Sequence, residues 1–255
     1  MEKLNDLRLA VLIDADNIPR KSMKLIMEEI AIYGTPTIKR IYGDFTKQEL
    51  SGWKSELLES AITPVQQFGY TTGKNSTDSA MIIDAMDILY GGRVDGFCLV
   101  TSDSDFTRLA LRLRESGQKV LGFGEKKTPK PFIVACDKFI YIEVLASLKK
   151  ELEPSSSSTE TEKKKKESGK LPAKILDLIL ASINDISDED GWAFLGELGN
   201  LIIKKQPDFD PRSFGFRSLT PLMKSMDELE IDARETNVPS IKHIYVREKR
   251  QAAQK

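Results

Sequence analysis

The first 150 residues alternate between two hydrophobic periods, and this alternation leaves few folds open to the chain. Short runs of consecutive apolar residues are typical of strands buried on both faces, and apolar residues repeated every three or four positions are typical of amphipathic helices. Strands are expected at 8–13, 37–42, 63–68, 96–101, 119–123 and 139–144. Helices are expected at 19–33, 48–60, 77–90, 106–115 and 131–136. Strands alternating with helices of this length predict an α/β fold whose mostly parallel sheet carries helices on both faces.

A different pattern follows residue 170. Three amphipathic helices and a short hairpin are expected, at 171–183, 192–205, 214–226, and 230–232 with 243–246. Three helices with a small β-wing are typical of a winged-helix module.

The segment between the two patterns has no residue, from Pro154 to Gly169, that would join a hydrophobic core. Its serines, glutamates and four consecutive lysines predict a disordered linker. The expected parts of the chain are a domain at 1–150, a linker at 151–169, a second domain at 170–248 and a basic tail at 249–255.

Composition narrows the functional classes. The net charge of −1 argues against a protein that binds nucleic acid through its overall charge. Binding through local basic patches is still compatible with the composition. The longest apolar runs are too short to span a bilayer, and the polar N-terminus is unlike a signal peptide. Cys98 and Cys136 are isolated, which predicts no disulfide framework. We expect a cytoplasmic protein without membrane contact, and a homo-oligomer is compatible with the composition.

Aspartates follow two of the expected strands directly. Asp14 ends the first strand, and Asp103 and Asp105 follow the strand at 96–101. Parallel strands bring their carboxyl ends to one edge, where open α/β sheets bind ligands. Asp78, in the first turn of its helix, would point to the same edge, with Asp84 further along as a second candidate. So many carboxylates need a cation between them to remain ionised, which predicts a divalent-metal site.

The available ligand types restrict the metal. The single histidine, His243, lies in the second domain, so neither a histidine relay nor a His/Cys zinc site is expected in the first. Oxygen ligands alone favour Mg²⁺ or Mn²⁺. A purely structural interpretation also exists, because Asp14 and Asp78 suit helix N-termini and Ser102 with Asp105 resembles a capping box. That interpretation leaves Asp103 unexplained.

Several neighbouring side chains would contact a substrate. Asn17 would orient Asp14 and a phosphate, or hydrogen-bond the loop backbone. Lys74 would reach a phosphate, although its surroundings do not have the spacing of a phosphate-binding loop. Ser102 and Arg108 are the remaining substrate-binding candidates.

A phosphatase is the rival enzyme class for the first motif. Asp14-x-Asp16 after a hydrophobic strand also opens phosphatases of the haloacid dehalogenase type. That family has Thr or Val where this chain has Ile18, and no clear lysine and carboxylate pair follows. We therefore place phosphoester hydrolysis below the other hypotheses.

Three motifs together resemble the NYN domain, a branch of the PIN-like nucleases: Asp14-x-x-Asn17, Lys74-x-x-x-Asp78 and Ser102-Asp103-x-Asp105-Phe106. The resemblance covers about residues 6–146. It implies a PIN-like α/β/α sandwich and a metal-dependent ribonuclease. In this family pattern, the four candidate ligands Asp14, Asp78, Asp103 and Asp105 form the acidic cluster. Asn17 and Asp84 would support it.

The segment from about 170 to 247 is similar to the OST-HTH/LOTUS domain. The similarity rests on Trp192-x-x-Leu195-Gly-x-Leu198-Gly199, Pro207-x-Phe209-Asp210 and Gly215-Phe216-x-x-Leu219. It implies a small winged-helix domain that binds RNA or a protein partner. The residues expected to face RNA are Lys204, Lys205, Arg212 and Arg217.

These features favour an RNA endonuclease that uses Mg²⁺ or Mn²⁺ and carries an RNA- or partner-binding module. The first alternative is a non-catalytic RNA-binding or scaffold protein whose acids are structural or hold an ion. The second is the phosphatase of small phosphoesters. The RNA target, the product ends and the number of metals are left open by the sequence.

Overall fold

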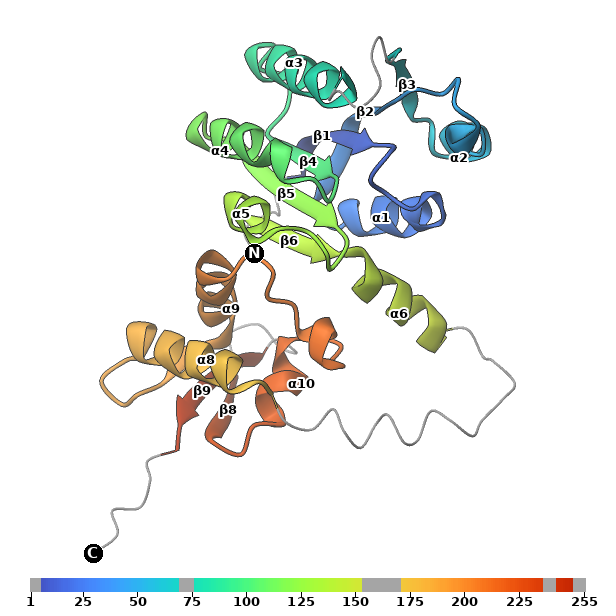
Figure 1. The fold of residues 1–255 in the computed structure, drawn as a ribbon. Coiled ribbons are helices and arrows are strands. Elements are labelled where there is room, and N and C mark those ends of the chain that lie inside the picture. Colours follow the sequence, from blue (N-terminus) through green and yellow to red (C-terminus); the bar gives the residue numbers. More distant parts are fainter. Residues whose placement is uncertain (1–5, 69–75, 153–170, 236–241, 250–255) are drawn as a thin grey trace, which may run out of the picture. The chain divides into compact units, whose positions relative to one another are not determined.

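The computed structural model describes residues 6–68, 76–152, 171–235 and 242–249 (Figure 1). The chain divides into two compact units, Met1–Glu153 and Pro154–Lys255. Most of the expected linker, the end of the basic tail and Lys74 lie outside the described residues. Among the described helices, none is long and apolar enough to cross a membrane.

The first unit is built on a six-stranded sheet in the order β3-β2-β1-β4-β5-β6. All of the strand pairs in it are parallel, as predicted. The strands are β1 (Leu7–Asp14), β2 (Gly34–Gly43), β3 (Thr63–Gln66), β4 (Gly96–Val100), β5 (Lys119–Gly124) and β6 (Lys138–Tyr141).

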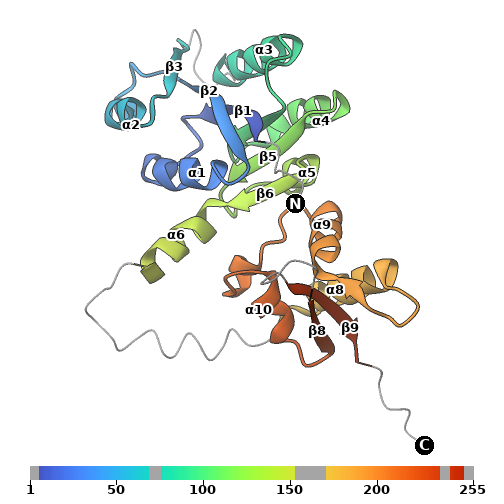
Figure 2. The ribbon, with the colours of Figure 1, turned by 180° about the vertical axis from the view of Figure 1, so that it is seen from behind.

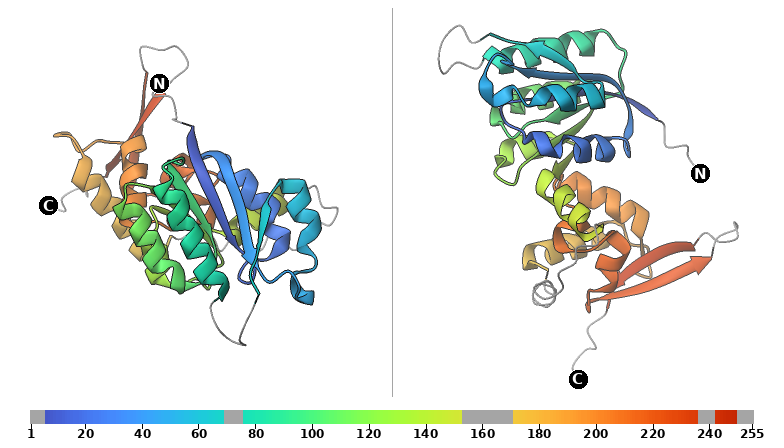
Figure 3. Two further views of the ribbon diagram at one scale, coloured as in Figure 1. Left: turned by 90° about the horizontal axis from the view of Figure 1, so that it is seen from above. Right: turned by 90° about the vertical axis from the view of Figure 1, so that its right-hand side faces the viewer.

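Helices cover both faces of this sheet, which confirms the predicted α/β/α sandwich. One layer consists of α1 (Met23–Ile30), α2 (Trp53–Ser60) and α6 (Ile142–Leu152). The other consists of α3 (Ser76–Tyr90), α4 (Thr107–Glu115) and α5 (Lys130–Ala135). Figure 2 and the left panel of Figure 3 show the strands between these two layers. Short 3-10 turns precede three of the helices: η1 (Arg20–Ser22), η2 (Gln48–Leu50) and η3 (Ser104–Phe106).

Strand β1 lies at the centre of the sheet and explains why the first apolar run is continuous. Val11 faces the layer of α1, Leu12 faces the layer of α3, and both side chains are fully buried. A strand covered on both faces needs apolar residues at every position. The register pairs Ile13 with Val100 of β4, so the residues that follow, Asp14 and Thr101, emerge side by side.

The end of the first unit differs from the prediction. The strand expected at 139–144 stops at Tyr141, and α6 follows it immediately. Ile142 and Leu145 are buried one helical turn apart. The run Phe-Ile-Tyr-Ile, which ends at Ile142, is typical of a strand and obscured this helical period in the sequence. Helix α6 continues to Leu152, two residues into the segment assigned to the linker.

The second unit has the predicted three helices and β-wing. Its elements are α8 (Ala173–Ile186), β7 (Ala193–Phe194), α9 (Leu195–Lys205), η4 (Pro211–Phe214), α10 (Leu219–Lys224), β8 (Leu229–Glu235) and β9 (Lys242–Glu248). Strands β8 and β9 pair antiparallel, and the two-residue β7, which we did not predict, extends the sheet beside β9.

The core of the second unit forms between its helices and this small sheet. Leu198 and Val246 are fully buried there, and Leu195 is nearly so. Trp192, from the same motif as Leu195 and Leu198, is only partly buried, with the Arg247 guanidinium 4.4 Å above its ring. The third helix is shorter than predicted because Gly215, at a φ of +80°, separates η4 from α10.

Candidate metal centre

Asp14 is the most buried acid of the first unit, with 1% of its surface exposed at the end of β1. Its Oδ2 accepts hydrogen bonds from Nδ2 of Asn17 at 2.7 Å and from Oγ1 of Thr101 at 2.8 Å. Its Oδ1 accepts from the backbone N–H of Asp16 at 3.2 Å. Burial raises the pKa of Asp14, and these hydrogen bonds oppose that rise by stabilising the charged form. The carboxylate is therefore fixed in position.

Asp103 begins the turn that leads from β4 into α4. Its Oδ1 accepts the backbone N–H of Asp105 at 2.9 Å, so Asp103 is the N-cap of η3. The purely structural interpretation of this motif placed the N-cap at Ser102, whereas the structure places it one residue later, at Asp103. Capping and metal ligation are compatible here, because a carboxylate has several acceptor sites on two oxygens.

Thr101 connects these two acidic segments and was missed by the sequence analysis. Its hydroxyl donates to Asp14 and accepts the backbone N–H of Asp103 at 3.1 Å, and its side chain is fully buried. The pairing register of β1 with β4 would have revealed it. This register places Thr101, the residue directly after β4, beside Asp14 at the end of β1.

Asp78 comes from the first turn of α3 and completes the centre. One carboxylate oxygen from each of Asp78, Asp103 and Asp105 lies within 4.8 Å of the other two. The pKa of Asp78 is raised to about 6, chiefly by burial and next by the negative charge of Asp14. The charges of Asp103 and Asp105 add to the same rise. The cluster therefore carries an excess of negative charge.

The donor set fits a hard divalent cation. Three carboxylates from two elements converge, and a fourth, Asp14, stands close enough to raise the pKa of Asp78. Oxygen ligands in this number suit Mg²⁺ or Mn²⁺. A cation at this position would remove the repulsion that raises the pKa of Asp78.

Asp84 does not join this cluster. Its carboxylate accepts hydrogen bonds from the guanidinium of Arg40 and the hydroxyl of Tyr42, both on β2. Six helical residues separate it from Asp78, which is roughly 9 Å along the axis of α3. Asp84 ties α3 to the sheet, and we leave it out of the proposed ligand set.

The predicted substrate contacts differ in their surroundings. Ser102 is only 7% exposed, and its Oγ accepts the backbone N–H of Glu125 at 2.9 Å. This bond ties the loop after β4 to the loop after β5 and gives Ser102 a structural role, while its contact with substrate stays a prediction. Arg108 is exposed in the first turn of α4, three residues after Asp105 and therefore on the same side of the helix.

The four basic residues predicted to face RNA in the second unit fall into two groups. The ammonium of Lys205 pairs with Asp185, and the guanidinium of Arg212 forms a largely buried pair with Asp210 at 2.7 Å. Both charges are offset within the fold, which does not support their predicted RNA contact. Lys204 and Arg217 are exposed.

A parallel α/β/α unit with aspartates gathered at the carboxyl ends of its strands is the arrangement expected of a PIN-like nuclease domain. The chain belongs to the NYN domain family, whose model matches residues 8–143. The OST-HTH/LOTUS domain model matches residues 167–241, in the second unit. Domains of this second family bind RNA. Both resemblances drawn from the sequence are confirmed.

Individual relatives add little on function. An uncharacterized protein of Methanocaldococcus jannaschii is 29% identical over 121 residues, which make up 46% of this chain and 47% of that protein. The matched region thus spans about half the length of this curated relative. A protein of unknown function from Vibrio parahaemolyticus aligns with 18% identity and a TM-score of 0.47, over 56% of this chain and 96% of its own. An uncharacterized Nitrosomonas europaea protein aligns with 32% identity and a TM-score of 0.30, over 40% and 90%.

Removal of the Thr101 hydroxyl tests whether its two hydrogen bonds serve the centre. In Thr101→Val the shape is kept but the bonds to Asp14 and Asp103 are lost. The metal-dependent RNA cleavage that the sequence predicts is expected to fall about tenfold in this variant, the effect of losing one bond to a charged group. Thr101→Ser keeps the hydroxyl and should retain activity near that of the unmodified chain. Equal rates for the two variants would remove Thr101 from the site.

Proposed function

We propose that this chain is an RNA endonuclease that depends on Mg²⁺ or Mn²⁺. The observation that carries the proposal is the convergence of Asp78, Asp103 and Asp105 within 4.8 Å, with Asp14 held beside them. Membership of a PIN-like nuclease family and the OST-HTH/LOTUS match support RNA as the substrate.

Each residue has a distinct part in this proposal. Asp78, Asp103 and Asp105 would hold the ion, and a bound divalent ion supplies Lewis acidity that acidifies water and offsets the charge of the scissile phosphate. The hydrogen bonds from Asn17 and Thr101 favour the ionised form of Asp14 and hold its carboxylate in one position. The second unit would recruit RNA, and its covalent connection would raise the local concentration of RNA at the centre.

The non-catalytic alternative is favoured by one observation. The hydrogen bonds that Asp14 accepts come from Asp16, Asn17 and Thr101, and Asp14 is outside the group of three converging carboxylates. An ion bound by the other three would then have a structural role. This alternative predicts RNA binding in EDTA and no turnover with any divalent metal.

Phosphatase activity has less support. A phosphoester would have to be attacked by a carboxylate oxygen of Asp14, which is 1% exposed and engaged by Asn17 and Thr101. We therefore do not carry this alternative further.

Incubation of the full chain with a circular single-stranded RNA tests the proposal. An endonuclease opens the circle, whereas an exonuclease needs an end. Linear product is expected with Mg²⁺ or Mn²⁺ and none with EDTA, since the carboxylates alone supply no Lewis acid. Intact circles under every metal condition, with RNA still bound, would establish the non-catalytic alternative instead.

A further inference from the structure

The loop between β5 and α5 lies against the acidic centre. It starts at Gly124, where a Cβ atom would come within 2.7 Å of both the carbonyl oxygen of Thr101 and Oγ1 of Thr128. Only a residue without a side chain permits this close approach. The loop is thus in direct contact with the strand end that holds Asp14 and Asp103 in place.

Hydrogen bonds fix the backbone of this loop. The Glu125 N–H donates to Ser102, and the Glu125 carbonyl accepts from both the N–H and the hydroxyl of Thr128 at 2.9 and 2.6 Å. The Lys126 N–H donates to the Glu143 carboxylate at 2.9 Å. Thr128 is 6% exposed. These bonds hold the loop at both ends and in the middle, so the backbone positions from which its side chains extend are fixed.

The side chains that this loop presents are cationic. Lys126, Lys127 and Lys130 are exposed on it or at its end, and α5 packs against both η3 and α4. Arg108 lies on the neighbouring first turn of α4. Within the described residues, neither Arg108 nor the ammonium of Lys126 has a carboxylate partner. Lys127 pairs with Glu125 at 2.6 Å, yet its side chain is 67% exposed, where such a pair is weak.

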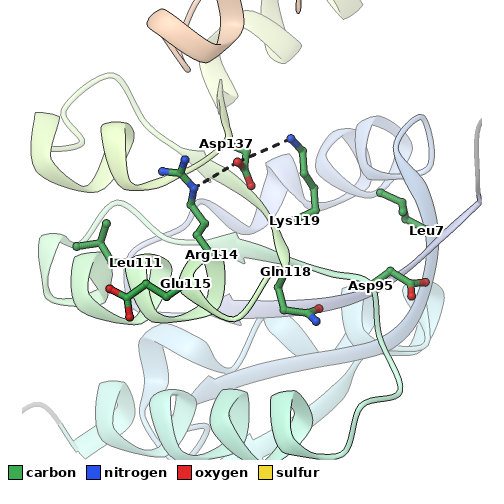
Figure 4. A pocket seen from close by; sticks show the side chains of 9 residues that line it. Leu7, Asp95, Leu111, Arg114, Glu115, Gln118, Lys119 and Asp137 are labelled. Carbon is green, nitrogen blue, oxygen red and sulfur yellow. Dashed lines mark ion pairs between the residues drawn. The ribbon is translucent and has the colours of Figure 1, made fainter.

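The opposite edge of the sheet offers a contrast. A hollow of about 710 Å³ lies at the amino ends of the strands, and the cations lining it are used by the fold. Figure 4 shows Arg114 and Lys119 directed at Asp137, at 3.2 and 3.9 Å. Its charges are offset, so this hollow lacks the free positive potential that a polyanion requires.

We propose that the β5–α5 loop (residues 124–130) and Arg108 form the track for the phosphate backbone of single-stranded RNA on one side of the acidic centre. The inference rests on the proposed function for the choice of RNA as ligand. Fixed cations would counter the repulsion between phosphates and the aspartates. Such contacts position a strand without reading its sequence, so the track would accept RNA of any sequence.

The test removes two charges from each edge of the sheet in the full chain. The loop variant is Lys126→Ala with Lys127→Ala, and the matched control is Arg93→Ala with Lys119→Ala at the amino edge, outside the centre. For the loop variant, the KM for single-stranded RNA should rise on the order of tenfold with kcat unchanged. The logarithmic salt dependence of kcat/KM should become shallower by about 1.4, about 0.7 for each lost phosphate contact. The control should match the unmodified chain.

A second measurement is independent of cleavage. Single-stranded RNA carrying 4-thiouridine is crosslinked to the full chain in EDTA, and the attached peptides are identified. Crosslinks in residues 124–130 without any cleavage would support the track while the nuclease proposal fails. Cleavage with an unchanged salt slope in the loop variant would overturn the track alone. Crosslinks confined to the second unit or to the amino edge would also overturn it.

Discussion

Replacement of Asp103 by asparagine is expected to lower metal-dependent RNA cleavage by about 100- to 1000-fold, the range seen when one preorganised electrostatic group is removed. Asp103 supplies one of the three converging carboxylates, and asparagine retains its size. The amide oxygen can still accept the Asp105 N–H, so the N-cap of η3 survives. The charge is lost while the local structure is kept.

The matched control is Asp87→Asn on the exposed side of α3. It removes the same charge from the same unit without touching the centre, and its cleavage rate should stay within about twofold of the unmodified chain. Thermal unfolding without metal should show Asp103→Asn at least as stable as the unmodified chain, because one repelling charge has gone. Cleavage that survives in Asp103→Asn would place the chemistry elsewhere.

The sequence predicted where three of the acids lie, because their positions follow from the end of a strand or the start of a helix. Asp14 and Asp103 come directly after continuous apolar runs, and a parallel sheet places such residues at one edge. Asp78 followed from its place in the first turn of a helix. In each case the local pattern and the fold class were sufficient to bring distant residues together.

The errors concern contacts between segments that no local pattern encodes. Asp84 pairs with Arg40, 44 residues earlier, and Ser102 accepts from Glu125, 23 residues later. The bond between Thr101 and Asp14 spans 87 residues and depends on the register of β1 against β4. A single sequence does not specify the register between two strands, so these partners could be identified only from the three-dimensional structure.

Acidification is expected to weaken the binding of Mn²⁺ by a factor that approaches tenfold for each pH unit well below 6 and amounts to about 50-fold between pH 6 and pH 4. The reason is the pKa of Asp78, which is raised to about 6 from an ordinary value of 3.8. An ion that uses this carboxylate must displace its proton. Calorimetry in buffers of different ionisation enthalpy should detect about one proton released per ion at pH 5 and close to none at pH 7.5.

The folding stability of the metal-free chain should change in the opposite direction to Mn²⁺ binding, and should increase as the pH falls. Between pH 4 and 6 the folded chain keeps a proton on Asp78 that the unfolded chain has lost, so folding is favoured at the acid end. This contribution is complete below pH 3.8 and disappears as the pH rises through 6. The metal-free unfolding midpoint should therefore fall over this interval, while the stabilisation given by added Mn²⁺ grows.

Asp78→Asn separates these effects from the titration of other acids. It should abolish the proton release at pH 5 and flatten the metal-free stability between pH 4 and 6, because the side chain no longer titrates. Asp87→Asn should keep both trends. A constant Mn²⁺ affinity from pH 7 to 5 in the unmodified chain would mean that Asp78 is not a ligand. The centre would then rest on Asp103 and Asp105 alone, too few protein ligands for a tightly held ion.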